Sequence, residues 1–198
     1  MTTILDHIVR QKIKEVKEKK SLYPVRLLEQ SIYFNSDTLS LKDYLLRKDS
    51  FGIIAEFKRK SPSKGWINEY ADVEQVSIAY MQAGASALSV LTDNEHFGGS
   101  NDDLRTARKF NFCPILRKDF IMDEYQIIEA KSIGADVILL LASILSANEI
   151  KQFATTAKWL GMEVLLEIRD KKELKSVNVL VDCIGVNNRS LKNFQVSL

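Results

Sequence analysis

Two cysteines are all that the 198-residue chain contains, and neither belongs to a Cys-X-X-Cys pair. This number is too small for the disulfide framework of a small secreted protein. Cys113 and Cys183 each lie inside an apolar run. That setting predicts buried, reduced thiols.

Long hydrophobic runs are also missing, since the longest covers only residues 137–142. A membrane span needs roughly 18 apolar residues, and residues 1–20 are charged throughout, unlike a signal peptide. Neither sign of charge dominates, because 28 basic and 26 acidic side chains leave a net charge of +2. This balance gives no reason to propose a nucleic acid or a membrane as the main partner. We therefore expect a cytoplasmic protein.

Several motifs of catalysis are absent from the sequence. It has neither the GXXXXGK(S/T) loop of many nucleotide hydrolases nor the GXSXG turn and Ser-His-Asp order of serine hydrolases. The two histidines, two cysteines and scattered carboxylates show no metal-ligand spacing, so the sequence predicts no metal site.

Residues 1–48 differ in pattern from the rest of the chain. Apolar side chains recur there at helical spacing between Lys, Arg and Glu: Ile4, Leu5, Ile8, Val9, Ile13 and Val16. This pattern predicts an amphipathic helix. Pro24 interrupts it, and a second helix is predicted over residues 39–47. Because the apolar face must be buried, we expect residues 1–48 to form a helical extension that caps one end of the main domain, residues 49–198.

From Phe51 onward, short apolar runs alternate with helical patterns. The runs cover residues 52–57, 87–91, 114–116, 137–141, 164–168 and 183–186. Helical patterning fills intervals such as 73–82 and 147–160, and Gly84, Gly134 and Gly161 stand where a helix ends. Such alternation is typical of parallel βαβ units. Without a Rossmann glycine fingerprint, six units favour a (β/α)8 barrel over a doubly wound sheet.

Charged and polar residues follow these runs, at the strand ends where barrel enzymes carry their active sites. They are Glu56, Lys58, Thr92, Asp93, Lys118, Asp119, Glu167, Asn187 and Arg189. Lysine and glutamate from different strands can neutralise one another and form acid–base pairs. Strand alternation also predicts that Leu139 and Leu141 face the interior of the barrel while Leu140 faces the helices.

Each of these residues also has an ordinary structural interpretation. Glu56 and Lys58 read equally well as exposed charges of an edge strand, and Lys118 as a solvated loop lysine. Glu167 fits a carboxylate at the start of a helix, and Asn187 a turn residue. His96 is a possible base by residue type, but its polar, glycine-flanked loop favours a structural role.

Five segments resemble the indole-3-glycerol-phosphate synthase family, in the same order along the chain. The more specific two are residues 53–65 (IIAEFKRKSPSKG) and residues 114–120 (PILRKDF). The others are residues 89–93 with 97–100, residues 163–167 and residues 184–189. The resemblance implies a (β/α)8 barrel with an N-terminal helical extension. It also implies a carboxy-lyase of tryptophan biosynthesis that uses no cofactor.

The resemblance assigns roles to the residues at the strand ends. Lys118 corresponds to a general acid that protonates the ribulose carbonyl oxygen, and Glu167 to a general base for the later dehydration. Glu56 and Lys58 correspond to their electrostatic partners, and Asn187 to a hydrogen-bonding aid. The remaining residues would contact the phosphorylated substrate: Ser61 and Arg189 its anionic groups, and Phe97, Phe120, Leu139 and Leu141 its benzene ring.

The family pattern continues beyond Leu198 through two further strands, which carry a Glu-Ser-Gly motif and phosphate-binding glycines. The sequence therefore predicts only about six of the eight units, in a fragment of a longer protein. Two other interpretations stay open: an inactive or scaffold piece of such a barrel, and another phosphate-binding barrel such as a phosphoribosylanthranilate isomerase. The resemblance also allows a missing C-terminal segment and other tryptophan-pathway enzymes as partners.

Overall fold

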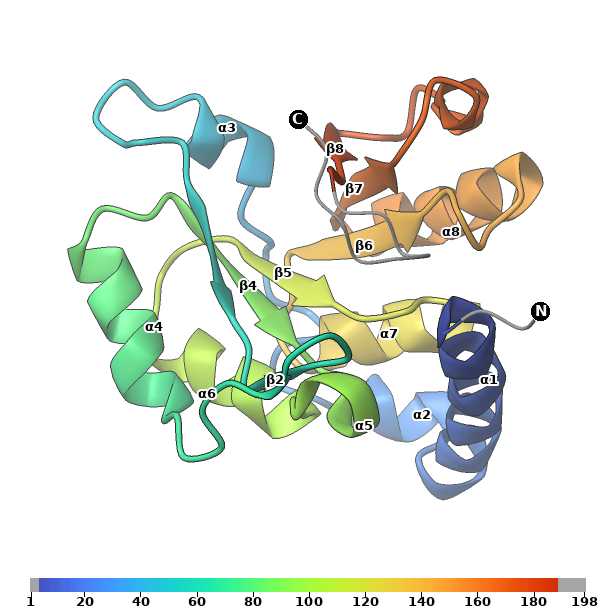
Figure 1. The fold of residues 1–198 in the computed structure, drawn as a ribbon, viewed down its shortest axis with the longest axis horizontal. Coiled ribbons are helices and arrows are strands. Elements are labelled where there is room, and N and C mark those ends of the chain that lie inside the picture. Colours follow the sequence, from blue (N-terminus) through green and yellow to red (C-terminus); the bar gives the residue numbers. More distant parts are fainter. Residues whose placement is uncertain (1–3, 189–198) are drawn as a thin grey trace.

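The computed structural model describes residues 4–188, which form a half-barrel built on a six-stranded parallel sheet (Figure 1). Its strands are β1 (Ile54–Phe57), β4 (Ala87–Leu91), β5 (Ile115–Lys118), β6 (Val137–Leu141), β7 (Glu163–Ile168) and β8 (Cys183–Val186). Each strand pairs with the next one of the sheet along the chain, in the order β1-β4-β5-β6-β7-β8. This is the winding of a (β/α) barrel, and every strand overlaps an apolar run that predicted it.

Side chains of one strand alternate between two apolar layers. Ile138 and Leu140 belong to the large core between the sheet and the helices, together with Ile150 and Phe153. Leu139 and Leu141 belong to a second cluster on the inner face of the sheet. The predicted orientation of these three leucines is therefore confirmed, as strand pleating requires.

The helices that connect the strands cover the outer face of the sheet (Figure 1). They are α4 (Val73–Gln82), α6 (Asn101–Phe110), α7 (Glu124–Ser132) and α8 (Ala147–Trp159), and a 3₁₀ turn, η1 (Glu173–Ser176), precedes β8. Side chains of Asp72, Ser100, Asp123 and Ser146 cap the four helices at their first turns. Gly84, Gly134 and Gly161 have positive φ values just after α4, α7 and α8, as predicted for helix ends.

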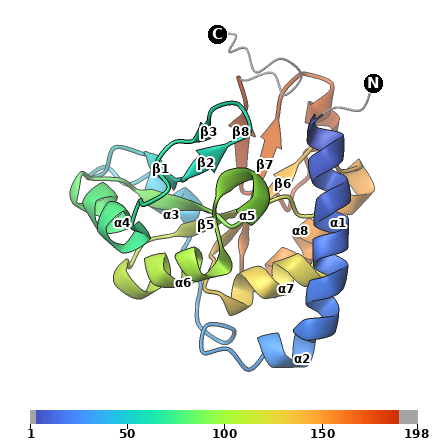
Figure 2. The same cartoon turned by 60° about the horizontal axis from the view of Figure 1, so that its bottom comes forward.

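The N-terminal residues form α1 (Ile4–Leu22), α2 (Val25–Leu28) and α3 (Leu41–Leu45). The second predicted helix is therefore shorter than residues 39–47, and α2 was not predicted. Figure 2 shows α1 alongside α7. On α1, Ile4 and Ile13 are about half exposed, whereas Lys12 is buried between Ile8 and Val16. The predicted apolar stripe was thus wrong at Ile4 and Ile13, which are exposed. Near Ile13 the residue that turns inward is Lys12, toward buried carboxylates.

Residues around α3 attach to the amino ends of the strands. The Leu41 side chain is fully buried against Ala87 and Val137, which begin β4 and β6. The Ser40 hydroxyl donates to Glu163 Oε1 over 2.6 Å at the start of β7. This end of the inner face is therefore closed by residues that precede the sheet in sequence.

The two thiols differ in burial. Cys113 is buried, and this burial raises the pKa of its thiol to about 11. Cys183 is only half-buried, because β8 has a strand partner on one side only among the described residues. Both are free cysteines, as predicted, but the burial prediction is confirmed for Cys113 alone. Between residues 4 and 188, no helix is both long and apolar enough to cross a membrane.

Candidate active site

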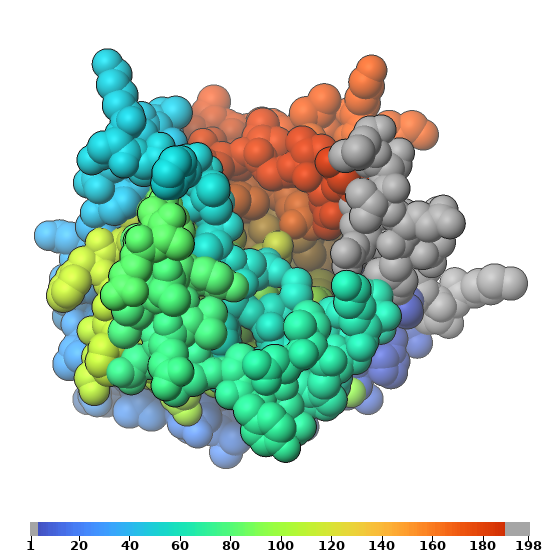
Figure 3. Space-filling model, turned by 60° about the vertical axis from the view of Figure 1, so that its left-hand side comes forward, coloured from blue at the N-terminus to red at the C-terminus, as the bar shows by residue number. Residues whose placement is uncertain are grey.

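A cavity of about 290 Å³ opens at the carboxyl ends of the strands. In the space-filling view, the surface is hollowed between the cyan segment that carries β1 and the red segment that carries β8 (Figure 3). All predicted site residues that the structure describes line this cavity: Glu56, Lys58, Ser61, Phe97, Lys118, Phe120, Leu139, Leu141, Glu167 and Asn187. Arg189 lies outside the described residues.

Lys118 is placed between two carboxylates that come from other strands. It is the last residue of β5, and its Nζ lies 3.4 Å from Glu167 Oε2 on β7 and 3.7 Å from Glu56 Oε2 on β1. The three side chains are 17–33% exposed, so solvent reaches them only in part. A cation held between two carboxylates in a partly closed site is suited to proton transfer.

Glu56 has a second cationic neighbour, Lys58, on the same face of the chain. Lys58 Nζ donates to Glu56 Oε1 over 2.7 Å, while Phe57 between them is buried in the core on the other face. Burial alone would raise the pKa of Glu56, but Lys118 and Lys58 outweigh it, so the net pKa lies below its ordinary value. Glu56 therefore stays ionised at neutral pH and acts as a fixed negative charge.

Asn187 follows β8 and contacts the carboxylate of the neighbouring strand. Its Nδ2 donates to Glu167 Oε1 over 2.9 Å, while Glu167 Oε2 faces Lys118. One oxygen of Glu167 is thereby held by an amide and the other faces an ammonium group. This fixes the orientation of the carboxylate.

The rest of the cavity wall is largely apolar. The rings of Phe97 and Phe120 are 6.0 Å apart at an interplanar angle of 39°, which is a favourable spacing for neighbouring aromatics. Leu139 and Leu141 of β6 form the floor of the cavity between the strands that carry Lys118 and Glu167. A flat aromatic group could therefore lie on these side chains beside the charged cluster.

The loop after β1 adds a buried hydroxyl group. Ser61 belongs to a two-residue strand, β2 (Lys60–Ser61), which pairs with β3 (Gly65–Trp66). Its side chain accepts a hydrogen bond from Lys64 N over 3.2 Å, so its own proton can be donated to an anion in the cavity.

Sequence reasoning missed part of the lining, namely Ile4, Leu5, Ile8, Pro62, Ser63, Leu91 and Asp119. The first three come from α1, which places the N-terminal helix in the wall of the cavity. Their contact with the site depends on how α1 docks, which helical periodicity does not reveal. Asp119 was noted as a strand-end residue but was given no role.

Asp119 connects the cavity to a buried network of charges. It pairs with Lys12 of α1 at 3.1 Å and with Arg117 of β5 at 3.0 Å, and Lys12 also pairs with Asp93 at 2.9 Å. Burial alone would raise the pKa of Asp119, but these cations lower it to about 2. The available signal in the sequence was the position of Arg117 directly after the apolar residues 114–116, where a charge needs buried partners. The structure shows this side chain fully buried.

His96 does not belong to the cavity lining. It lies in the short helix α5 (Asn94–Phe97), where its backbone N–H donates to Asp93 Oδ1 over 2.8 Å. Its ring Nδ1 lies 3.2 Å from the same oxygen. The predicted structural role fits this capping geometry better than that of a base in the cavity.

A parallel α/β half-barrel with acid–base side chains at its strand ends defines the class of the molecule as a barrel-type enzyme. The model of the family described as indole-3-glycerol phosphate synthase matches residues 5–198. The chain belongs to the indole-3-glycerol phosphate synthase family.

Relatives from several bacteria carry that name. The protein of Bacteroides thetaiotaomicron is 48% identical over 98% of this chain and 74% of its own length. That of Bacillus cereus is 44% identical over 100% of this chain and 75% of its own. That of Thermoanaerobacter pseudethanolicus is 42% identical over 98% of this chain and 74% of its own length. Each is named indole-3-glycerol phosphate synthase, and the chain spans about three quarters of their length.

Proposed function

We propose that the chain catalyses the decarboxylating ring closure of 1-(2-carboxyphenylamino)-1-deoxyribulose 5-phosphate to indole-3-glycerol phosphate, in tryptophan biosynthesis. The family and the named relatives support this activity. The observation that carries the mechanism is the position of Lys118 between Glu167 and Glu56, beside an apolar wall. The reaction is a carbon–carbon lyase step that also releases water.

In the first step, the ring carbon that bears the carboxylate attacks the carbonyl carbon of the ribulose chain. A carbon–carbon bond forms, and the carbonyl oxygen takes a proton from the Lys118 ammonium group. Loss of CO2 then leaves its electron pair in the ring and restores aromaticity. The enzyme must mainly hold the two carbons together, and the wall of Phe97, Phe120 and the two β6 leucines suits that task.

In the second step, the new hydroxyl group takes a proton from solvent and leaves as water, and the five-membered ring loses a proton. Glu167 is the base for that proton, because Asn187 holds one of its oxygens while the other faces the cavity. Lys118 has lost its proton in the first step and lies 3.4 Å from Glu167, so the proton that Glu167 takes from the ring can return to Lys118. Glu56 and Lys58 balance the charge around these transfers.

The proposal assigns the anionic groups of the substrate to Ser61 and Arg189. Ser61 is buried at the cavity wall and has a hydroxyl proton to donate. Residues 1–48 act as the cap of a barrel domain, residues 49–198. The pocket residues Ile4, Leu5 and Ile8 of α1 support this division, because they cover the site and help to exclude water. A phosphorylated substrate crosses membranes poorly, so action in the cytoplasm belongs to the proposal.

The activity is tested with the full natural gene product and the carboxyphenylamino substrate. We expect the indole fluorescence of the product to rise in step with released CO2. A phosphoribosylanthranilate isomerase would act on a different substrate and release no CO2, and an inactive scaffold would give neither signal. Absence of both signals from correctly folded protein would overturn the proposal.

A further inference from the structure

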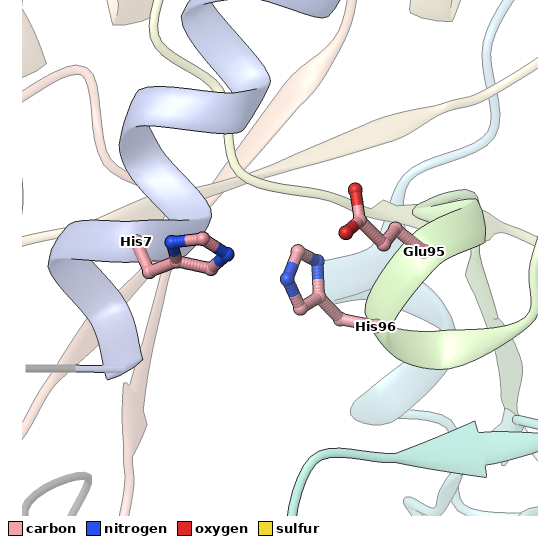
Figure 4. A group of neighbouring side chains, drawn as sticks. All are labelled: His7, Glu95 and His96. Atoms are coloured by element: carbon pink, nitrogen blue, oxygen red, sulfur yellow. The ribbon is translucent and has the colours of Figure 1, made fainter.

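The two histidines of the chain lie close to each other, outside the lining of the cavity. His7 projects from α1 and His96 from α5, and their rings point toward each other with the Glu95 carboxylate beside them (Figure 4). One ligand atom from each of these three residues lies within 4.8 Å of the other two. The rings are 6.4 Å apart and nearly perpendicular, so they are not stacked.

We propose that His7, Glu95 and His96 form a binding site for a divalent transition-metal cation of the Zn²⁺ type. Two imidazoles and one carboxylate are a favourable ligand set for Zn²⁺, which leaves a fourth position for water. In a tetrahedral site, ligand atoms lie roughly 3.3 Å apart, given metal–ligand bonds of about 2.0–2.1 Å. His7 and Glu95 are exposed, so small side-chain rotations can close the remaining distance.

Neighbouring residues hold two of the ligands in suitable orientations. Asp93 Oδ1 lies 3.2 Å from His96 Nδ1, so that nitrogen donates to it and Nε2 keeps its lone pair for a metal. Asp93 is itself fixed by its ion pair with the buried Lys12. Such carboxylate–histidine pairs are typical behind a metal ligand.

Gln11 supports the site from α1, one turn after His7. Its Nε2 donates to Glu95 Oε1 over 2.6 Å, which leaves the other carboxylate oxygen for the metal. Gln11 Oε1 is buried and has no hydrogen-bond partner among the described residues. A metal-bound water would supply the missing donor. The Lys60 ammonium group donates to the backbone carbonyl of Glu95 at 2.7 Å, so it offsets part of the attraction for a cation.

The site would join two elements that line the catalytic cavity. His7 adjoins Ile8 of α1, and His96 adjoins Phe97 of α5, and both of these neighbours contact the cavity. A bound cation would therefore hold the N-terminal helix against α5. Binding of the cation should therefore raise the stability of the fold, and this expectation does not depend on the catalytic assignments.

The test uses untagged full-length protein, because a histidine tag would itself bind the metal. Calorimetric titration with ZnCl2 is expected to give one ion per chain for the wild type and for Glu18→Gln, which removes an exposed carboxylate elsewhere on α1. His7→Ala and Glu95→Gln should each weaken binding at least tenfold. Zn²⁺ at about tenfold over its Kd should raise Tm by roughly 3 °C in the wild type and Glu18→Gln. The rise should be much smaller in His7→Ala and Glu95→Gln.

Absence of Zn²⁺ binding in the micromolar range by the wild type would overturn the site. Equal binding by the wild type and His7→Ala would also overturn it, because the ion would then sit elsewhere, for example on Cys183. Circular dichroism of both ligand variants confirms that they are folded, since the two substituted side chains are exposed.

Discussion

Lys118 Nζ and Glu167 Oε2 lie 3.4 Å apart, although the two residues come from strands that are not neighbours in the sheet. The strand between them, β6, carries Leu139 and Leu141 on its inner face. The sheet thus places an ammonium group and a carboxylate on either side of an apolar floor. A substrate whose aromatic ring lies on the leucines would have its reacting atoms near both groups.

Glu167→Gln should lower kcat by roughly 10²- to 10⁴-fold, because the amide keeps the size of the side chain but cannot accept the proton. KM should change little, since the charge acts on the reacting ring and not on the phosphate. Steady-state kinetics by indole fluorescence gives both constants. Asn187→Ala is the comparison: it leaves the base in place but removes one holding contact, so its loss of kcat should be smaller. Equal losses for both variants would argue against Glu167 as the base.

Lys12→Met should destabilise the fold by about 3–5 kcal/mol, because it leaves Asp93 and Asp119 buried without the shared cation. Urea unfolding measures the free energy of unfolding. Lys14→Met, on the exposed side of the same helix, is the matched control and should change it by less than about 0.5 kcal/mol. Similar effects of the two substitutions would show that Lys12 does not anchor α1.

Because the pKa of Asp119 is lowered, we expect the free energy of unfolding to fall in acid. Lys12 and Arg117 outweigh the effect of burial and hold its pKa at about 2, below the ordinary 3.8. The unfolded chain then binds more protons in this range, so stability is fully present above pH 3.8 and falls as the pH drops toward 2. The lowered pKa of Asp119 contributes about 2 kcal/mol to the free energy of unfolding above this range.

Unfolding free energies measured across that range should therefore show a shallower pH dependence for Asp119→Asn than for the wild type. Asp102→Asn, whose side chain is 84% exposed, should keep the slope of the wild type. An unchanged slope in Asp119→Asn would mean that other carboxylates control unfolding in acid.

The sequence predicted the strands and the charged residues at their ends well because both depend on local patterns, whereas Ser61, Phe97 and Phe120 entered the predicted site only through the resemblance. Short apolar runs give the strands, and parallel strands bring their carboxyl ends to one edge, so Lys118 and Glu167 had to lie on the same side of the sheet. The resemblance to a family then supplied roles that the residue pattern left open between catalysis and solvated charge.

Other features depend on contacts between distant segments, which local patterns do not contain. In sequence, Lys12 is only one of several charged residues between the apolar positions of α1, and it is the packing of α1 that brings it to Asp93 and Asp119. His7 and His96 showed no ligand spacing in sequence, yet the docking of α1 brings them together. The role of Arg189 stays a prediction, because this residue lies outside those described.

The most direct test of the account compares Lys118→Ala with Lys118→Arg in the full natural gene product. Loss of a positioned general acid should lower turnover by roughly 10²- to 10⁴-fold. Arg should fail to restore it, because a guanidinium group does not release its proton near neutral pH. Lys14→Ala is the control and should retain wild-type activity, and circular dichroism should show all three variants folded. Near wild-type rates of indole-3-glycerol phosphate formation by both Lys118 variants would contradict the assignment of Lys118 as the acid.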